Sequence, residues 1–140
     1  MTHRFALRVY YEDTDLAGIV YHANYLKFIE RARSDLVRAA GVSQSDMKQQ
    51  AGIVFAVRRM EIAYLSPARF EDDLEVRTAF GPLKGARFDL DQSVWRGDQA
   101  LFQARVQVVC IDQKGRAVRI PADIRQNLTE FAQGHGGKPE

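Results

Sequence analysis

Hydrophobic and polar residues change their spacing at two points near the start of the chain. Between residues 4 and 11, Phe5, Leu7, Val9 and Tyr11 alternate with polar or small residues, and this period of two is typical of a half-buried strand. From Asn24 the apolar residues recur at spacings of three and four, as on one face of a helix: Tyr25, Phe28, Ile29, Ala32, Leu36, and Ala39 or Ala40. With Asn24 as N-cap and Gly41 as the stop, the pattern predicts one long helix over residues 24–40.

The remaining chain reads mostly as strands. A short helix is expected from Ser43, a capping serine followed by an acid, to Gly52. Strands are then predicted over residues 53–64, 73–80, 86–95, 100–111 and, briefly, 117–120. The connectors "SPARFED", "GPLKG", "RGDQ" and "DQKG" carry turn residues, and three of them look like hairpins. Residues 121–132 predict a last amphipathic helix, and residues 133–140 a flexible tail.

This order of elements predicts an α+β fold. Because a sheet must bury one face, and only the long helix is apolar enough to cover it, we expect a hotdog fold. In it a long central helix is wrapped by a five- to six-stranded, mostly antiparallel sheet. The length of 140 residues fits a single domain, which we place at residues 1–132.

Composition narrows the function classes. The net charge of +2 comes from 20 basic and 18 acidic residues without a long basic block, so charge gives no support to nucleic-acid binding. The single cysteine, Cys110, excludes an intramolecular disulfide framework. The first residues lack the apolar core of a signal peptide, and no run is long enough for a transmembrane segment. We therefore expect a soluble, cytoplasmic protein.

The stretch "VYYEDTDLAGIVYHANYLKFIERAR", residues 9–33, carries a family signature. It closely resembles the hotdog-fold acyl-CoA thioesterases of the 4-hydroxybenzoyl-CoA thioesterase type, and in particular their Tol-Pal-associated subgroup, YbgC. The likeness continues through "FAVRRMEIAYLSPARFEDDLEV" and "VQVVCID" and so covers nearly the whole chain apart from its tail. The motif shows no departure from the family pattern.

The resemblance implies roles for three residues. The second aspartate of the family's D-x-D-x-x-G-x-V motif is the catalytic carboxylate, and it falls on Asp15. His22 stands where the family places a backbone N–H against the thioester carbonyl. For the closer subgroup, Tyr11 and the His22 side chain are also implicated.

The chemistry of thioester hydrolysis needs the same residue types. A carboxylate such as Asp15 can activate water or attack the carbonyl, and donors must face the developing oxyanion. The free N–H groups at the start of the long helix, at His22 and Ala23, suit that task. Gly18 would supply a sharp turn. The three residues that follow it, Ile19, Val20 and Tyr21, would exclude water.

Each residue also has a structural interpretation. Short acidic loop residues often cap or bend the chain, and Glu12 and Asp13 are interpreted as solvated loop acids. A histidine beside a helix start is more often packed or capping than catalytic, and a strand tyrosine such as Tyr11 is ordinarily core or interface. Glu30 is the alternative carboxylate, since some hotdog thioesterases use the central helix, but a spacing of three favours an ion pair with Arg33.

The sequence contains no motif for a cysteine nucleophile, a metal site, a serine hydrolase or a dinucleotide-binding loop. Cys110 lies in an apolar strand and is interpreted as inert packing, and the histidines and cysteine lack metal-ligand spacing. No G-x-S-x-G or G-x-G-x-x-G sequence occurs, and "RGD" at residues 96–98 is most simply a turn. We expect no metal or redox cofactor.

The substrate and assembly complete the predictions. Coenzyme A is polyanionic, so the mouth of the pocket that binds it should be basic. Lys84 and Arg87 are our candidates, taken from a wider set that includes Arg58, Arg59, Lys114 and Arg116. We expect an acyl-CoA with a short to medium aliphatic or small aromatic acyl group, with acyl carrier protein as an alternative carrier.

One helix cannot cover a sheet of this size and its edges, so a homodimer or homotetramer with an intersubunit site is expected. The alternative function is a non-catalytic acyl-thioester binding or scaffold protein linked to the cell envelope or lipid synthesis. A hotdog hydratase is a weaker third interpretation, because the Asp and His of hydratases lie five residues apart, whereas Asp15 and His22 lie seven apart.

Overall fold

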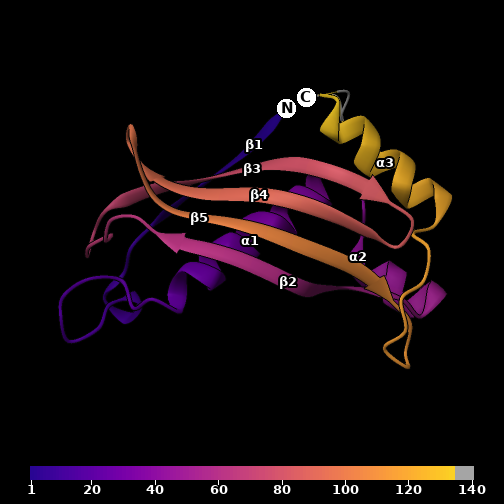
Figure 1. The fold of residues 1–140 in the computed structure, drawn as a ribbon, viewed down its shortest axis with the longest axis horizontal. Coiled ribbons are helices and arrows are strands. Elements are labelled where there is room, and N and C mark those ends of the chain that lie inside the picture. The colour runs from indigo at the N-terminus through magenta and orange to yellow at the C-terminus, as the bar shows by residue number, and fades with distance from the viewer. Residues whose placement is uncertain (135–140) are drawn as a thin grey trace.

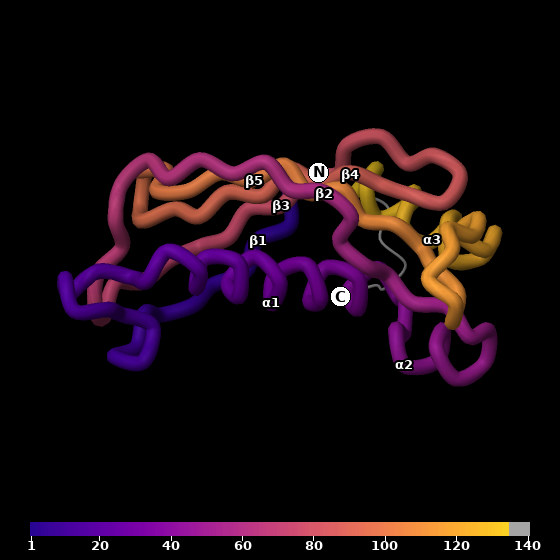
Figure 2. The backbone as a smooth tube through the Cα atoms, turned by 60° about the horizontal axis from the view of Figure 1, so that its bottom comes forward, coloured from indigo at the N-terminus to yellow at the C-terminus, as the bar shows by residue number. Residues whose placement is uncertain are grey.

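A long helix lies along one face of a five-stranded antiparallel sheet. The computed structural model describes residues 1–134. Figure 1 views the sheet with the helix behind it, and Figure 2 shows the helix running beneath the strands. The elements are β1 Thr2–Arg8, a 3₁₀ turn Tyr11–Asp13, α1 Asn24–Ala39, α2 Gln44–Asp46 continued by a π-helical turn Met47–Ala51, β2 Val54–Tyr64, β3 Asp73–Lys84, β4 Arg87–Arg96, β5 Gln99–Ile111 and α3 Ala122–Ala132. The strand order is β1-β3-β4-β5-β2, so the predicted α+β hotdog architecture is confirmed.

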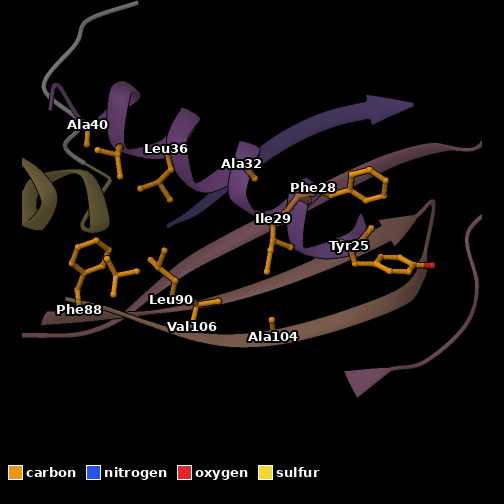
Figure 3. Packing of buried hydrophobic residues seen from close by; sticks show 14 of the residues in the cluster. Tyr25, Phe28, Ile29, Ala32, Leu36, Ala40, Phe88, Leu90, Ala104 and Val106 are labelled. Carbon is orange, nitrogen blue, oxygen red and sulfur yellow. The ribbon is translucent and has the colours of Figure 1, made fainter. Parts of the chain in front are cut away.

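The core forms between α1 and the sheet. The apolar spacing that predicted the helix corresponds to its buried face, and Ala40, just past its end, is buried while Ala39 is not fully so. In Figure 3 these side chains point toward Phe88 and Leu90 of β4 and toward Ala104 and Val106 of β5. Each fully buried large aliphatic or aromatic side chain contributes about 1.5–3 kcal/mol to stability. This packing fixes where the two ends of α1 lie against the sheet.

Most element boundaries agree with the sequence prediction to within a few residues. Ser43 caps α2 by accepting a hydrogen bond from the Asp46 N–H, and Gly52 ends the following turn with a φ of 67°. The connectors "GPLKG" and "RGDQ" do join neighbouring strands, β3 to β4 and β4 to β5. The segment that links β2 to β3 instead crosses between strands that are not neighbours.

Three local predictions were wrong. Tyr11 belongs to the 3₁₀ turn, because β1 ends at Arg8. Residues 117–120 form no strand, since only Ala117 bridges to Ile111. Asn24 is the first helical residue and Ala23 is the cap, because the Asn24 amide donates to the carbonyl oxygen of Asp13 at 2.9 Å instead. Of the predicted tail, residues 135–140 lie outside the described residues.

The two ends of the sheet are structurally different. One end carries the start of α1, Tyr64 at the end of β2 and the β4–β5 turn. The other end carries the end of α1, the β3–β4 turn and the start of β2, and α3 packs there (Figure 1). We call these the helix-start end and the helix-finish end. None of the helices within residues 1–134 is long and apolar enough to cross a membrane.

Candidate active site

Asp15 stands at the tip of a small hairpin at the helix-start end. A bridge between Thr14 and Val20 closes the hairpin, and the Asp15 N–H donates to the carbonyl oxygen of Ile19 at 3.0 Å. At the tip, the Asp15 carboxylate accepts the Ala17 N–H at 2.9 Å, and Gly18 adopts a φ of 79°. This left-handed conformation explains the glycine at that point. The carboxylate of Asp15 is exposed to solvent.

Asp13 is the residue that organises this hairpin. It is only 8% exposed, and its carboxylate accepts the Tyr10 N–H at 2.8 Å. Its carbonyl oxygen accepts both the Tyr21 N–H and the Asn24 side-chain amide, each at 2.9 Å. The interpretation of Asp13 as a solvated loop acid was therefore wrong. Glu12, its neighbour, is exposed as expected.

The hairpin is anchored to the segment that leads into β3. Ile19 bridges to Arg69, and the Val20 N–H donates to the carbonyl oxygen of Ala68 at 2.8 Å. The buried Tyr25 hydroxyl, on the first turn of α1, accepts the Ala68 N–H at 2.9 Å. Burial raises the pKa of Tyr25, so this hydroxyl stays neutral near neutral pH. The loop that carries Asp15 is thereby tied to the start of the central helix.

His22 and Ala23 lead directly into α1. Within residues 1–134, neither the His22 N–H nor the Ala23 N–H donates a hydrogen bond to the protein. The carbonyl oxygen of His22 accepts the Tyr64 hydroxyl at 2.9 Å, and the His22 ring lies 4.5 Å from the Tyr21 ring. The positive end of the helix dipole adds to these donors. Such a pair of N–H groups is chemically suited to polarise a carbonyl oxygen.

Tyr64 was missed by the sequence reasoning, which placed it only as the end of a strand. Its contact with His22 spans 42 residues, so no local spacing could reveal it. Its ring also lies 5.7 Å from Tyr25 and 5.3 Å from Phe102. Tyr64 thus fixes the position of the His22 backbone relative to the sheet.

The position of Tyr11 and the solvent exposure around Asp15 differ from expectation. The Tyr11 side chain is 81% exposed and packs edge-on against Phe70 at 6.3 Å. No hydrogen bond joins Tyr11 to Asp15 or His22 in the described part of the chain. Val20 is buried in the core, but Tyr21 is 45% exposed and Leu16 fully exposed. A single chain therefore leaves Asp15 open to water instead of walled off.

Lys84 and Arg87 lie far from Asp15 in the same chain. They pair across the β3–β4 turn, at the helix-finish end, whereas Asp15 is at the helix-start end. The 16 residues of α1 alone separate the two ends by about 24 Å. Among the basic candidates, Arg59 and Arg116 form ion pairs with Glu61 and Asp112, whereas residues 1–134 provide no ion pair for Lys84 or Arg87.

The alternative carboxylate, Glu30, has a different partner from the predicted one. Its carboxylate accepts the Ser34 hydroxyl, and no ion pair to Arg33 forms within residues 1–134. Arg33 instead donates to the side-chain oxygen of Gln92 at 3.0 Å. The ion-pair prediction was therefore wrong, because the guanidinium turns inward under α1.

The remaining chemical groups agree with a site built on Asp15 and the start of α1. Burial raises the pKa of the Cys110 thiol, which disfavours the reactive thiolate. In the part of the chain that the structure describes, no cluster of three or more His, Cys, Asp or Glu side chains could hold a metal ion.

The helix-on-sheet layers and the loop before the helix define a hotdog-fold protein, and comparison with known proteins gives the family. The thioesterase-like superfamily model matches residues 9–128, so the chain belongs to that family. It is 40% identical over 132 residues to the acyl-CoA thioester hydrolase YbgC of Escherichia coli, covering 93% of this chain and 96% of that protein. The acyl-CoA thioesterase YbgC of Haemophilus influenzae is 38% identical over 122 residues, covering 86% and 90%.

A solved structure gives the same result. The chain matches a probable thioesterase from Bartonella henselae with a TM-score of 0.83 and 38% identity, over 86% of this chain and all of the other. The predicted family resemblance is thus confirmed. Because the family and these relatives agree over most of the chain, the protein is a thioester hydrolase.

Proposed function

We propose that this protein is an acyl-CoA thioesterase in which Asp15 is the catalytic carboxylate and the N–H groups of His22 and Ala23 polarise the thioester carbonyl. The acyl-CoA thioesterase activity rests on the family and on its YbgC relatives. The observation that carries the residue assignment is the combination of an exposed carboxylate on a tightly held hairpin with two unused backbone donors at the start of α1.

The chemistry follows from these groups. The Asp15 carboxylate removes a proton from a water molecule as that water attacks the carbonyl carbon, or attacks the carbonyl carbon itself, and in both routes the carbonyl oxygen gains negative charge. The two N–H groups and the helix dipole stabilise that charge. The thiolate of coenzyme A then leaves and takes up a proton. In the nucleophilic route water hydrolyses the mixed anhydride on Asp15, so both routes give the free acid and coenzyme A. Tyr11 and the His22 imidazole would have secondary roles in this scheme.

The complete site requires a second copy of the chain. Strand β2 is an edge strand, and its helix-facing side chains Val57, Ile62 and Tyr64 are 40–48% exposed. If two copies pair antiparallel along β2, the helix-start end of one meets the helix-finish end of the other. Lys84 and Arg87 of one copy would then lie near the Asp15 loop of the other, where they can bind the phosphates of coenzyme A.

A variant pair tests the catalytic carboxylate. Asp15→Asn keeps the size of the side chain, so KM and folding should change little, while kcat should fall by about a hundred- to ten-thousandfold. Glu12→Gln is the matched control, an exposed acid three residues away, and should retain kcat. If Asp15→Asn keeps more than about a tenth of wild-type kcat, Asp15 is not the catalytic carboxylate and Glu30 is tested next.

A substrate panel separates the enzyme from a binding protein. We expect turnover of short to medium aliphatic or small aromatic acyl-CoA thioesters, followed by thiol release, with acyl carrier protein thioesters as a second series. If both series stay at the uncatalysed rate, the protein is a non-catalytic acyl-thioester binding or scaffold protein, with the envelope or lipid-synthesis link that the resemblance suggests.

The assembly is tested separately. We expect a homodimer or homotetramer by light scattering at micromolar concentration, and a cytoplasmic location for the domain of residues 1–132. Ile62→Glu, which places a charge among the partly exposed helix-facing side chains of the edge strand β2, should shift the protein toward monomer and reduce activity together. An active wild-type monomer would contradict the shared site.

A further inference from the structure

Arg33, halfway along α1, carries a half-buried positive charge. Residues 1–134 provide no ion pair for it, and its only hydrogen bond in this part of the chain goes to the side-chain oxygen of Gln92 at 3.0 Å. Burial lowers the pKa of Arg33, and the charge of Glu30 opposes this shift. A desolvated guanidinium is costly unless something binds it. The proposed catalytic steps make no use of this residue.

Gln92 holds the guanidinium in one direction. Gln92 is 2% exposed, and its amide nitrogen donates to the carbonyl oxygen of Ile29 at 2.9 Å and to the Thr78 hydroxyl at 3.0 Å. One amide hydrogen is therefore donated to Thr78 on the sheet and the other to Ile29 on α1. Its oxygen is left to face Arg33, which makes Gln92 a positioning residue for the cation.

Arg33 lines a cavity of about 140 Å³ between α1 and β2. Its apolar lining comes from the helix and three strands: Val37, Phe55, Ala56, Val57, Phe88 and Val108. Glu30, Ser34 and Gln44 complete the lining. The exposed Glu30 carboxylate accepts the Ser34 hydroxyl and is screened by solvent. The cavity thus combines apolar side chains with the Arg33 cation and, at its exposed side, the Glu30 carboxylate.

The cavity lies toward the helix-finish end. Phe55 pairs with Cys110, and Val57 and Phe88 both pair with Val108, near the start of β2 and of β4. In the proposed dimer this is the end that meets the Asp15 loop of the second copy. The inference below rests on that proposed function.

We propose that this cavity binds the far end of the acyl group, and that Arg33, aimed by Gln92, recognises a carboxylate at that end. A carboxylate can accept two parallel hydrogen bonds from a guanidinium, while the apolar walls cover the methylene groups. The enzyme should therefore prefer thioesters of short dicarboxylic acids over those of monocarboxylic acids of the same length.

Matched substrate pairs test the preference without any variant. Wild-type kcat/KM is measured for hexanoyl-CoA against adipoyl-CoA and for heptanoyl-CoA against pimeloyl-CoA. We expect the dicarboxylic member to be favoured by about ten- to a hundredfold, the size of a hydrogen bond to a charged group. Equal or lower values for both dicarboxylic members would overturn the proposal.

Variants test whether Arg33 and Gln92 cause the preference for dicarboxylic thioesters. Arg33→Met should remove it by lowering kcat/KM for adipoyl-CoA while hexanoyl-CoA is unchanged or improved. Gln92→Leu should weaken it in the same direction, mainly through KM. Arg31→Met, an exposed arginine on the same helix, is the control and should keep the wild-type ratio. Equal losses on both substrates in folded Arg33→Met protein would mean a structural role and overturn the proposal.

Binding separates this inference from the proposed function. Calorimetry with Asp15→Asn protein compares adipoyl-CoA with hexanoyl-CoA, and adipate with hexanoate is compared as an inhibitor of the wild type. Tighter binding of the dicarboxylic ligands supports the cavity assignment even if no thioester is turned over. If thioesters are turned over but binding shows no such difference, the cavity assignment fails alone.

Discussion

Replacing Asp13 should mainly lower stability, whereas replacing Asp15 should mainly lower kcat. Asp13→Ala removes the acceptor for the Tyr10 N–H at 2.8 Å in a residue that is 8% exposed. The two hydrogen bonds to the Asp13 carbonyl oxygen survive, because they belong to the backbone. The perturbation is therefore one lost capping interaction at the base of the hairpin.

The magnitude follows from that single bond. Removing a side-chain cap costs about 0.5–2 kcal/mol, and a hydrogen bond to a charged group about 1.5–3 kcal/mol. We expect a loss of about 1–2 kcal/mol, which lowers the Tm of a chain of this size by about 3–8 °C. Asp13→Asn retains an acceptor oxygen and should lose less. Asp15→Asn, at an exposed carboxylate, should leave Tm nearly unchanged.

Melting and kinetics are measured on the same preparations. Thermal unfolding is followed by circular dichroism, and kcat at saturating acyl-CoA well below the melting range. Asp13→Ala should lower Tm while keeping kcat within about tenfold of wild type, whereas Asp15→Asn should lose kcat by about a hundredfold or more at unchanged Tm. The reasoning is refuted if Asp13→Ala melts with the wild type, or if Asp13→Asn loses as much kcat as Asp15→Asn.

Three further predictions concern the loop and the core. Tyr64→Phe removes the donor to the His22 carbonyl oxygen at 2.9 Å and should cost about 0.5–1.5 kcal/mol in a urea melt; an unchanged midpoint would show that the bond contributes nothing. Gly18→Ala forces a side chain into a φ of 79° and should destabilise the protein by about 1–2 kcal/mol, with a loss of kcat as the Asp15 loop shifts; full activity and stability would contradict the turn assignment. Burial raises the pKa of Cys110 above its usual 9.0, so its thiol should resist a disulfide reagent at pH 8 until the protein is unfolded; rapid labelling of folded protein at pH 8 would contradict this. The contribution of the neutral thiol to stability is present below about pH 9 and should be lost as the pH rises through the folded pKa.

The helices, the strands and the candidate carboxylate Asp15 could be predicted from the amino-acid sequence alone. Spacings of two and of three and four are local properties, so the strands and the buried face of α1 could be predicted directly. The turn at Gly18 also follows from local chemistry, because glycine tolerates a positive φ. The boundaries failed at Tyr11, which local hydrogen bonds between Tyr10 and Asp13 place in a 3₁₀ turn. They also failed at Asn24, whose side chain donates to the carbonyl oxygen of Asp13 instead of capping the helix.

Which residues from distant parts of the chain lie together depends on the folded arrangement of helix and sheet. Asp13 looks the same as Asp15 in the sequence, and it is buried because the hairpin folds back and Asn24 reaches its carbonyl oxygen. Arg33 meets Gln92 from 59 residues away, and this contact prevents the local ion pair with Glu30. The strand order β1-β3-β4-β5-β2 likewise places the β3–β4 turn at the opposite end from Asp15. Such contacts depend on how strands pair across the sheet, and no local pattern of residues encodes that pairing.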